Sequence, residues 1–293
     1  MSSLQLIVPL ALASAMAAAI AAAHRRLPWR FAARLLTATI VAASLAVLPA
    51  VAILAIGYVA HLSMLGGVVE WCQDALGAHS PVPPWLGLSS VAIIVLGTVR
   101  VRAVVRSWRS VRRTDAGPPE VICSRSWFAF TLPGSAGRIV LSSALVDALT
   151  ADELAVVVSH EQTHARHRHD RYVLVADFAN ALLPIMRPLQ RRLLFALERW
   201  ADESSVTAAS GDRNVVARTI ARVALAHAPV PAPATGLAGL GVAARVDALT
   251  NPRTLLRPNV WSSAVALGPV AVLMAAMVQV HHLVPLIGAL CLR

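Results

Sequence analysis

The sequence contains no lysine, since all 26 of its basic residues are arginine. Alanine and valine are abundant, so we interpret both features as a nucleotide-composition bias of the source genome and assign no function to them. Cysteine is scarce as well. Three cysteines do not make a disulfide framework, and none has the spacing of a metal-ligand pair. The sequence therefore excludes a disulfide-stapled domain and a cysteine-based metal site.

Charged residues are also few. They make up 14% of the 293 residues, against 57% hydrophobic residues, and the mean hydropathy is +0.65. A soluble globular domain is usually less apolar and more charged. The apolar residues form four long stretches that predict four transmembrane helices. The stretches cover about residues 4–23, 35–60, 85–104 and 260–280. In the first, the positive charges follow the apolar run, so we expect a retained span and not a cleaved signal peptide.

Charge placement predicts the orientation of these spans. The loop 24–34 carries four arginines, whereas the loop 61–84 carries only two acidic residues, and six arginines lie between residues 100 and 113, at and just after the end of the third span. By the positive-inside rule both termini are extracytoplasmic, and a domain over about 105–257 is cytoplasmic. The segment 258–293 then holds the fourth span and a short tail. Cys72 and Cys291 would both face outward, and their pairing is left open.

The net charge of +11 comes largely from arginines next to the predicted spans. Arginines in that position suit a bilayer with anionic headgroups better than a nucleic acid. We therefore expect a lipid partner and no direct nucleic-acid partner.

The segment SHEQTH carries the main chemical signal. His160 and His164 are four residues apart, so in a helix both imidazoles lie on one face and can hold one Zn²⁺. Glu161 is placed to act as the general base on a zinc-bound water. Periodicity predicts a helix over 151–168, which starts at a capping box formed by Thr150 and Glu153.

A second acidic pair completes the predicted site. Glu198 and Asp202 share one face of a later helix, with Glu198 as the third zinc ligand and Asp202 as the acceptor for a ligand-histidine N–H. Glu203 points about 100° away and ranks lower. His167 and His169 are expected on a basic surface, because a fourth protein ligand would close the metal site to water.

The rest of the central domain predicts an α+β fold. Three short runs predict a small antiparallel sheet, and a nearly span-like segment predicts an amphipathic helix and turn against the membrane. A further amphipathic helix precedes a Pro/Gly/Ala-rich linker. In chain order these segments are 121–124, 127–132, 137–141, 172–189, 215–227 and 229–241.

The motifs SHEQTHARHRHD and ERWADE, in this order after the spans, resemble the BlaR/MecR-type antirepressor metallopeptidases. AFTLPG, GRIVLSSALVDAL and E-x-x-A-D are similar to the HtpX and CAAX-prenyl-protease group. The resemblance implies an integral membrane protein with four spans and a zincin-like (gluzincin) cytoplasmic domain. It also implies that His160, His164 and Glu198 bind zinc, with Glu161 as base and Asp202 behind the ligands. The chain runs only to Arg293, so we expect a relative that lacks the extracellular penicillin-binding sensor.

The expected function is zinc-dependent hydrolysis of peptide bonds at the cytoplasmic membrane face, in regulatory proteolysis of a transcriptional repressor or of the chain itself. Three alternatives remain open: a quality-control protease for membrane proteins, a scaffold with a structural zinc, and a metal transporter. Glu161 argues against the scaffold, because a structural zinc needs no base. The near absence of ionisable residues within the spans argues against transport. The sequence does not give the oligomeric state.

Overall fold

A computed structural model gives the fold, and it describes most of the region between the first and last predicted spans. The described residues are 11, 14–20, 22, 26–60, 82–112, 120–134, 137–226, 235–236, 241–251, 268–274 and 277. The first and fourth predicted spans, and both outward-facing cysteines, lie largely or wholly outside them. Within the described part the protein is mostly helical.

Two helices are long and apolar enough to cross a membrane. Helix α2 runs over Trp29–Ala60 and helix α4 over Pro84–Arg112, and both extend beyond the predicted spans. At about 1.5 Å per residue each exceeds the roughly 30 Å of a bilayer's hydrocarbon core. Only 11% of the most apolar stretch of α4 is buried within the protein, so this helix presents an apolar surface outward. The predicted boundary between residues 104 and 105 falls inside α4.

A small sheet follows α4. It consists of β1 (Glu120–Ile122), β2 (Ala129–Thr131), β3 (Ile139–Ser142) and β4 (Thr235–Gly236), in the order β1-β3-β2-β4. The expectation of a wholly antiparallel sheet is wrong, because β1 pairs with β3 in parallel while β2 pairs antiparallel with β3 and β4. The linker expectation missed β4, since a two-residue pairing leaves no hydrophobic pattern.

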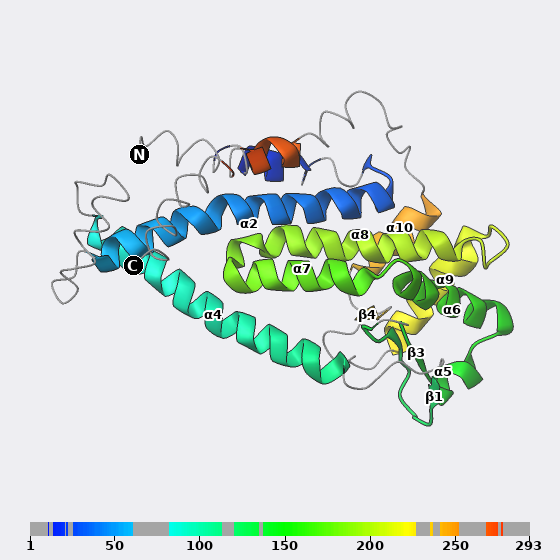
Figure 1. Cartoon of the computed structure of the whole chain (residues 1–293). Coiled ribbons are helices and arrows are strands. Elements are labelled where there is room, and N and C mark those ends of the chain that lie inside the picture. Colours follow the sequence, from blue (N-terminus) through cyan, green and yellow to red (C-terminus); the bar gives the residue numbers. More distant parts are fainter. Residues whose placement is uncertain are drawn as a thin grey trace.

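The other labelled helices lie beside α2 or next to the sheet (Figure 1). They are α5 (Ser143–Ala148), α6 (Ala151–Arg166), α7 (His169–Leu182), the 3₁₀ turn η3 (Pro184–Met186), α8 (Arg187–Ser205), α9 (Arg213–Ala226) and α10 (Val242–Thr250). Helix α6 begins with the predicted capping box, in which Thr150 and Glu153 cap each other's backbone N–H. Arg168 adopts a left-handed conformation (φ 52°), which separates α6 from α7.

Buried apolar residues form two clusters. The first joins α2, α7 and α8, with Leu36, Val173 and Leu193 among its members. The second joins the sheet to α5, α6, α9 and α10, and it contains Val157 and Ile220. Figure 1 shows α7 and α8 running beside α2, while α6, α9 and the sheet lie at one end of this bundle. Polar side chains, Arg199 and Asp202 of α8 and Arg245 of α10 among them, link α8 to α10 at the boundary between the clusters.

Candidate metal centre and active site

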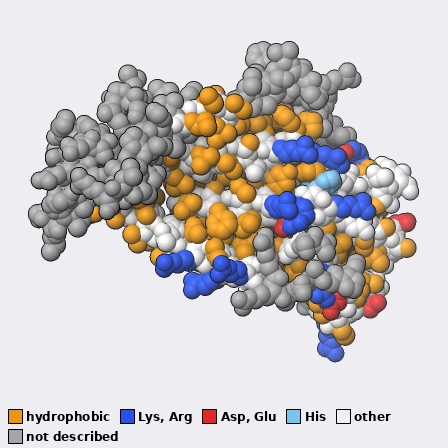
Figure 2. Space-filling view, viewed as in Figure 1, with side chains coloured by type: hydrophobic (Ala, Val, Ile, Leu, Met, Phe, Trp, Pro, Cys, Tyr) orange, Lys and Arg blue, Asp and Glu red, His pale blue; other side chains and the backbone are white. Residues whose placement is uncertain are grey.

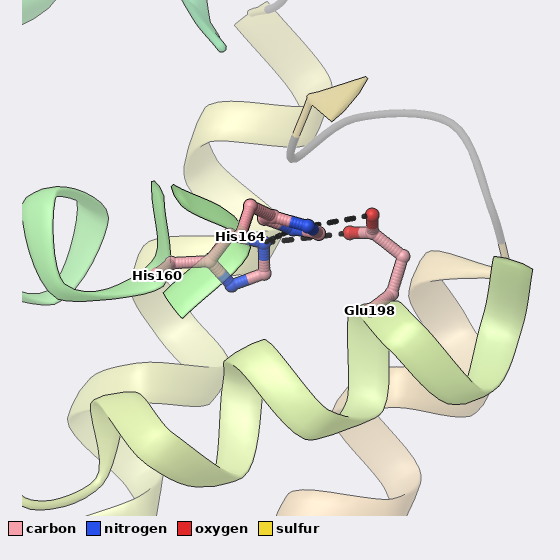
Figure 3. Close-up of side chains that lie close together, drawn as sticks. All are labelled: His160, His164 and Glu198. Carbon is pink, nitrogen blue, oxygen red and sulfur yellow. Dashed lines mark hydrogen bonds and ion pairs between the residues drawn. The ribbon is translucent and has the colours of Figure 1, made fainter. Parts of the chain in front are cut away.

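His160, His164 and Glu198 converge although they come from two helices, α6 and α8 (Figure 3). Nε2 of His160 lies 3.1 Å from Nε2 of His164 and 3.4 Å from Oε2 of Glu198, and Nε2 of His164 lies 3.5 Å from Oε1 of Glu198. Tetrahedral zinc with bonds of about 2.0–2.2 Å places its ligand atoms roughly 3.3–3.6 Å apart. The three donors therefore fit one zinc ion and leave the fourth coordination position open.

The two ligand histidines are held by different partners. Because both face the metal through Nε2, each carries its proton on Nδ1. Nδ1 of His160 lies 3.2 Å from Oδ1 of Asp202, and Nδ1 of His164 lies 2.8 Å from Nδ1 of His169. With Nε2 of His164 given to a metal, its Nδ1–H would donate to Nδ1 of His169, which would then be neutral with its proton on Nε2. These contacts fix the tautomer and the direction of each ring.

The prediction that His169 belongs to a basic surface is therefore wrong. Its side chain is buried, and its ring packs against His164 and the indole of Trp200. Helix α7 starts at His169 directly after the left-handed Arg168, which turns the chain and brings the imidazole back against α6. His167 is half-buried and stacks on Trp200.

Arg245 is the main charged residue that sequence reasoning missed. It comes from α10 and is fully buried. Its Nη1 lies 2.9 Å from Oε2 of Glu198, while Nε and Nη2 donate to the two oxygens of Asp202 at 2.9 and 2.5 Å. The guanidinium thus pairs with Asp202 in a bidentate manner and also contacts a ligand carboxylate. A sequence signal existed, because Arg245 shares a face of α10 with buried Leu249, and a lone charge on an apolar face needs a buried partner.

Glu161 lies beside the metal ligands and is completely buried. The hydroxyl of Thr131, on β2, lies 2.8 Å from its Oε2 and 3.0 Å from its backbone carbonyl oxygen. Its other carboxylate oxygen, Oε1, has no hydrogen-bond partner among the described residues. One oxygen of Glu161 is therefore held in place and the other is available to a ligand.

The buried charges shift the pKa values of the site. Burial alone lowers the pKa of His160, but contacts with Asp202 and Glu198 outweigh it and raise that pKa to about 9. Burial lowers the pKa of His164 to about 4 and raises that of Glu161 to about 7. Burial opposes ionisation of Asp202, yet Arg245 holds its pKa below the usual range.

Glu203 lies away from the metal ligands, as its position on α8 predicts. It pairs with Arg213 of α9 and lies 3.6 Å from Arg199. Arg222, also of α9, pairs with Glu153 at the start of α6. Both arginines therefore contact acidic residues outside the metal centre.

A buried His-His-Glu set on two helices, with a glutamate beside the first histidine, defines a zinc metallopeptidase. The comparison with known families agrees, because residues 101–226 match peptidase family M48. The matched residues include α6 and α8 with all three candidate ligands, while Arg245 lies beyond the matched part. No match was found among curated proteins or among solved structures.

Proposed function

We propose that the chain is an endopeptidase that cuts peptide bonds at the cytoplasmic face of a membrane. The observation that carries this proposal is the His160, His164 and Glu198 set with an open position beside Glu161. The resemblance to the BlaR/MecR group supports a regulatory substrate, such as a transcriptional repressor or the chain itself. Figure 2 shows hydrophobic side chains across the middle of the visible face, with arginines at its lower and right-hand sides, which supports the predicted orientation.

Each residue of the site has a distinct task in this proposal. Zinc, held by His160, His164 and Glu198, would lower the pKa of a water molecule and polarise the scissile carbonyl. Glu161 takes the proton through Oε1 and returns it to the leaving amine, while Thr131 holds Oε2. The Thr131 contact fixes the carboxylate, so proton transfer needs little rearrangement.

Asp202 and Arg245 act behind the ligands. Oδ1 of Asp202 lies 3.2 Å from Nδ1 of His160, and this contact favours the tautomer that directs Nε2 at the metal. Arg245 offsets the negative charge that Glu198 and Asp202 bring together in a buried place. Without this cation the two carboxylates would repel each other.

The test compares the full-length wild type with Glu161→Gln, both purified in detergent with zinc. Cleavage of candidate cytoplasmic proteins, and self-cleavage, should fall by at least about 1000-fold in the variant while bound zinc stays at one per chain. Glu203→Gln is the matched control, because it changes a nearby acid that pairs with Arg213 and should leave cleavage unchanged.

Equal cleavage by wild type and Glu161→Gln would remove the proposed mechanism. The scaffold with a structural zinc would be favoured if His160→Ala lost its zinc while the wild type cleaved none of the proteins offered. Cleavage of misfolded membrane proteins in preference to repressors would favour the quality-control protease.

A further inference from the structure

The turn between α7 and α8 lies against the apolar part of α4. A Cβ placed on Gly97 of α4 would touch Leu182, at the end of α7, at 3.4 Å, so the two helices approach closely at that level. Ile185 is the middle residue of η3, just beyond Leu182, and 78% of it is exposed. Helix α7 also contacts α4 nearer the C-terminal end of α4, where Nε1 of Trp108 donates to Oδ2 of Asp177 at 3.1 Å.

The sequence of α4 indicates where a bilayer would end. Its residues up to Val99 carry no charge, and the exposed ones include Ile93, Leu96 and Val99. Arginines begin at Arg100. Gly97 therefore lies in the last turn of the apolar part, and the tip of the α7–α8 turn lies at that level or deeper.

Arginines also follow the tip of the turn, at the start of α8. Arg187 and Arg191 are exposed and Arg192 is half-buried, within the first two turns of α8 after Ile185. An exposed aliphatic side chain followed by arginines is the pattern of a segment that inserts shallowly into a bilayer, with its cations at the headgroups.

We propose that the α7–α8 turn inserts into the leaflet on the arginine-rich side, and that α7 acts as a spacer between the bilayer and the metal centre. Helix α7 has 14 residues, hence a length of about 21 Å, and its first residue contacts the ligand His164. Figure 1 shows α7 parallel to α2, so this length lies along the direction in which α2 would cross the membrane.

This geometry limits where a membrane-anchored substrate can be cut, and that part rests on the proposed peptidase function. From the level of the α7–α8 turn such a chain must extend about 20 Å to reach the metal, which takes roughly six residues at about 3.3 Å each. The cleaved bond of a membrane-anchored substrate then lies at least about six residues from that level.

The insertion is tested without reference to activity. In a full-length background with Cys72, Cys123 and Cys291 changed to serine, a nitroxide label is placed at Ile185→Cys or at Leu225→Cys. Leu225 is the matched control, because it is an aliphatic residue that is 90% exposed but lies near the end of α9. In nanodiscs containing anionic lipid, the label at 185 should collide with oxygen and be shielded from a water-soluble nickel chelate, and the label at 225 should show the reverse.

A label at 185 that resembles the one at 225 would overturn the proposal. Shielding from both oxygen and nickel would overturn it too, because it would place Ile185 under another protein surface or a second copy of the chain.

The spacing is tested with a reporter peptide that the wild type cuts in solution. The same peptide is then fused to a transmembrane anchor through Gly/Ser linkers of about 2, 6 and 12 residues. We expect cleavage with the two longer linkers and at least a tenfold loss with the shortest. Equal cleavage with all three would overturn the spacing, whereas failure to cut the free peptide would count against the peptidase function and leave the labelling result standing.

Discussion

At the scale of single residues, the two ligand histidines are fixed by chemically different acceptors. A carboxylate behind His160 increases the electron density of its ring, whereas the neutral imidazole behind His164 does so less. His169 can accept only while it is uncharged, and burial lowers its pKa well below the usual range. The site therefore has a carboxylate behind one ligand histidine and an imidazole behind the other.

Replacing His169 with phenylalanine should weaken zinc binding by about 10–100-fold, because His164 loses its acceptor. The affinity is measured by competition with a chromophoric chelator. The matched control is His167→Phe, which keeps an aromatic ring on Trp200 and removes no acceptor from a ligand. Equal affinities in the two variants would contradict the role of His169.

Replacing Arg245 with methionine should lower the stability of the protein by about 3–5 kcal/mol, because Glu198 and Asp202 are left buried without their cation. The expected result is a large fall in the melting temperature in detergent. Arg218→Met, on the exposed side of α9, should change it little. A small shift for Arg245→Met would show that the two carboxylates find another counter-charge.

At the scale of elements, α6 is held in place by its cap and by a close approach to the turn before β3. Gly137 has φ +61°, and a Cβ at this position would lie 2.7 Å from the Cβ of Ala165 on α6. Only glycine accepts both this conformation and this contact. The glycine therefore allows the strand pair to rest on the helix that carries both ligand histidines.

Gly137→Ala should accordingly destabilise the protein by about 1–3 kcal/mol, through backbone strain and overpacking together. Gly134→Ala is the control, since no atom lies within 4 Å of a Cβ at that position. Thermal unfolding of the two variants side by side measures the difference. Similar melting temperatures would mean that Ala165 can move away at little cost.

The sequence predicts those elements whose signals are local. The capping box at Thr150 and the i, i+4 spacing of His160 and His164 mark α6 and its ligands, and the length of the apolar runs marks α2 and α4. Contacts made by distant segments leave no such pattern. Strand β4, the parallel pairing of β1, and the contacts of Arg245 and His169 with their partners depend on packing between elements far apart in sequence.

At the scale of the whole molecule, the metal centre lies between the two apolar clusters. Its ligands come from α6, which belongs to the cluster of the sheet, and from α8, which belongs to the cluster of α2. Arg199 of α8 adds to this link, with Nη1 and Nη2 donating to the carbonyl oxygens of Arg245 and Ala248 of α10 at 3.3 and 3.4 Å. Zinc would thus add a further link between the two halves.

Zinc removal should therefore lower the stability of the whole protein. A ligand present at about 1,000 times its Kd adds about 4 kcal/mol to the folded state, so a strong chelator should cause a clear fall in melting temperature. The His160→Ala variant should melt at the same temperature with or without chelator. Amide exchange should increase more in α6 than in α2 when zinc is removed, and an equal increase would argue against the bridging role.

Helices α7 and α8 supply one wall of the catalytic centre, yet their apolar faces pack on α2. A fragment that starts after α4 would keep every zinc ligand but leave Val173, Leu193 and Trp200 without their covering. Such a fragment would aggregate in water instead of behaving as a detachable enzyme. Because α8 packs on α2, a change that loosened α2 would also act on the helix that carries Glu198.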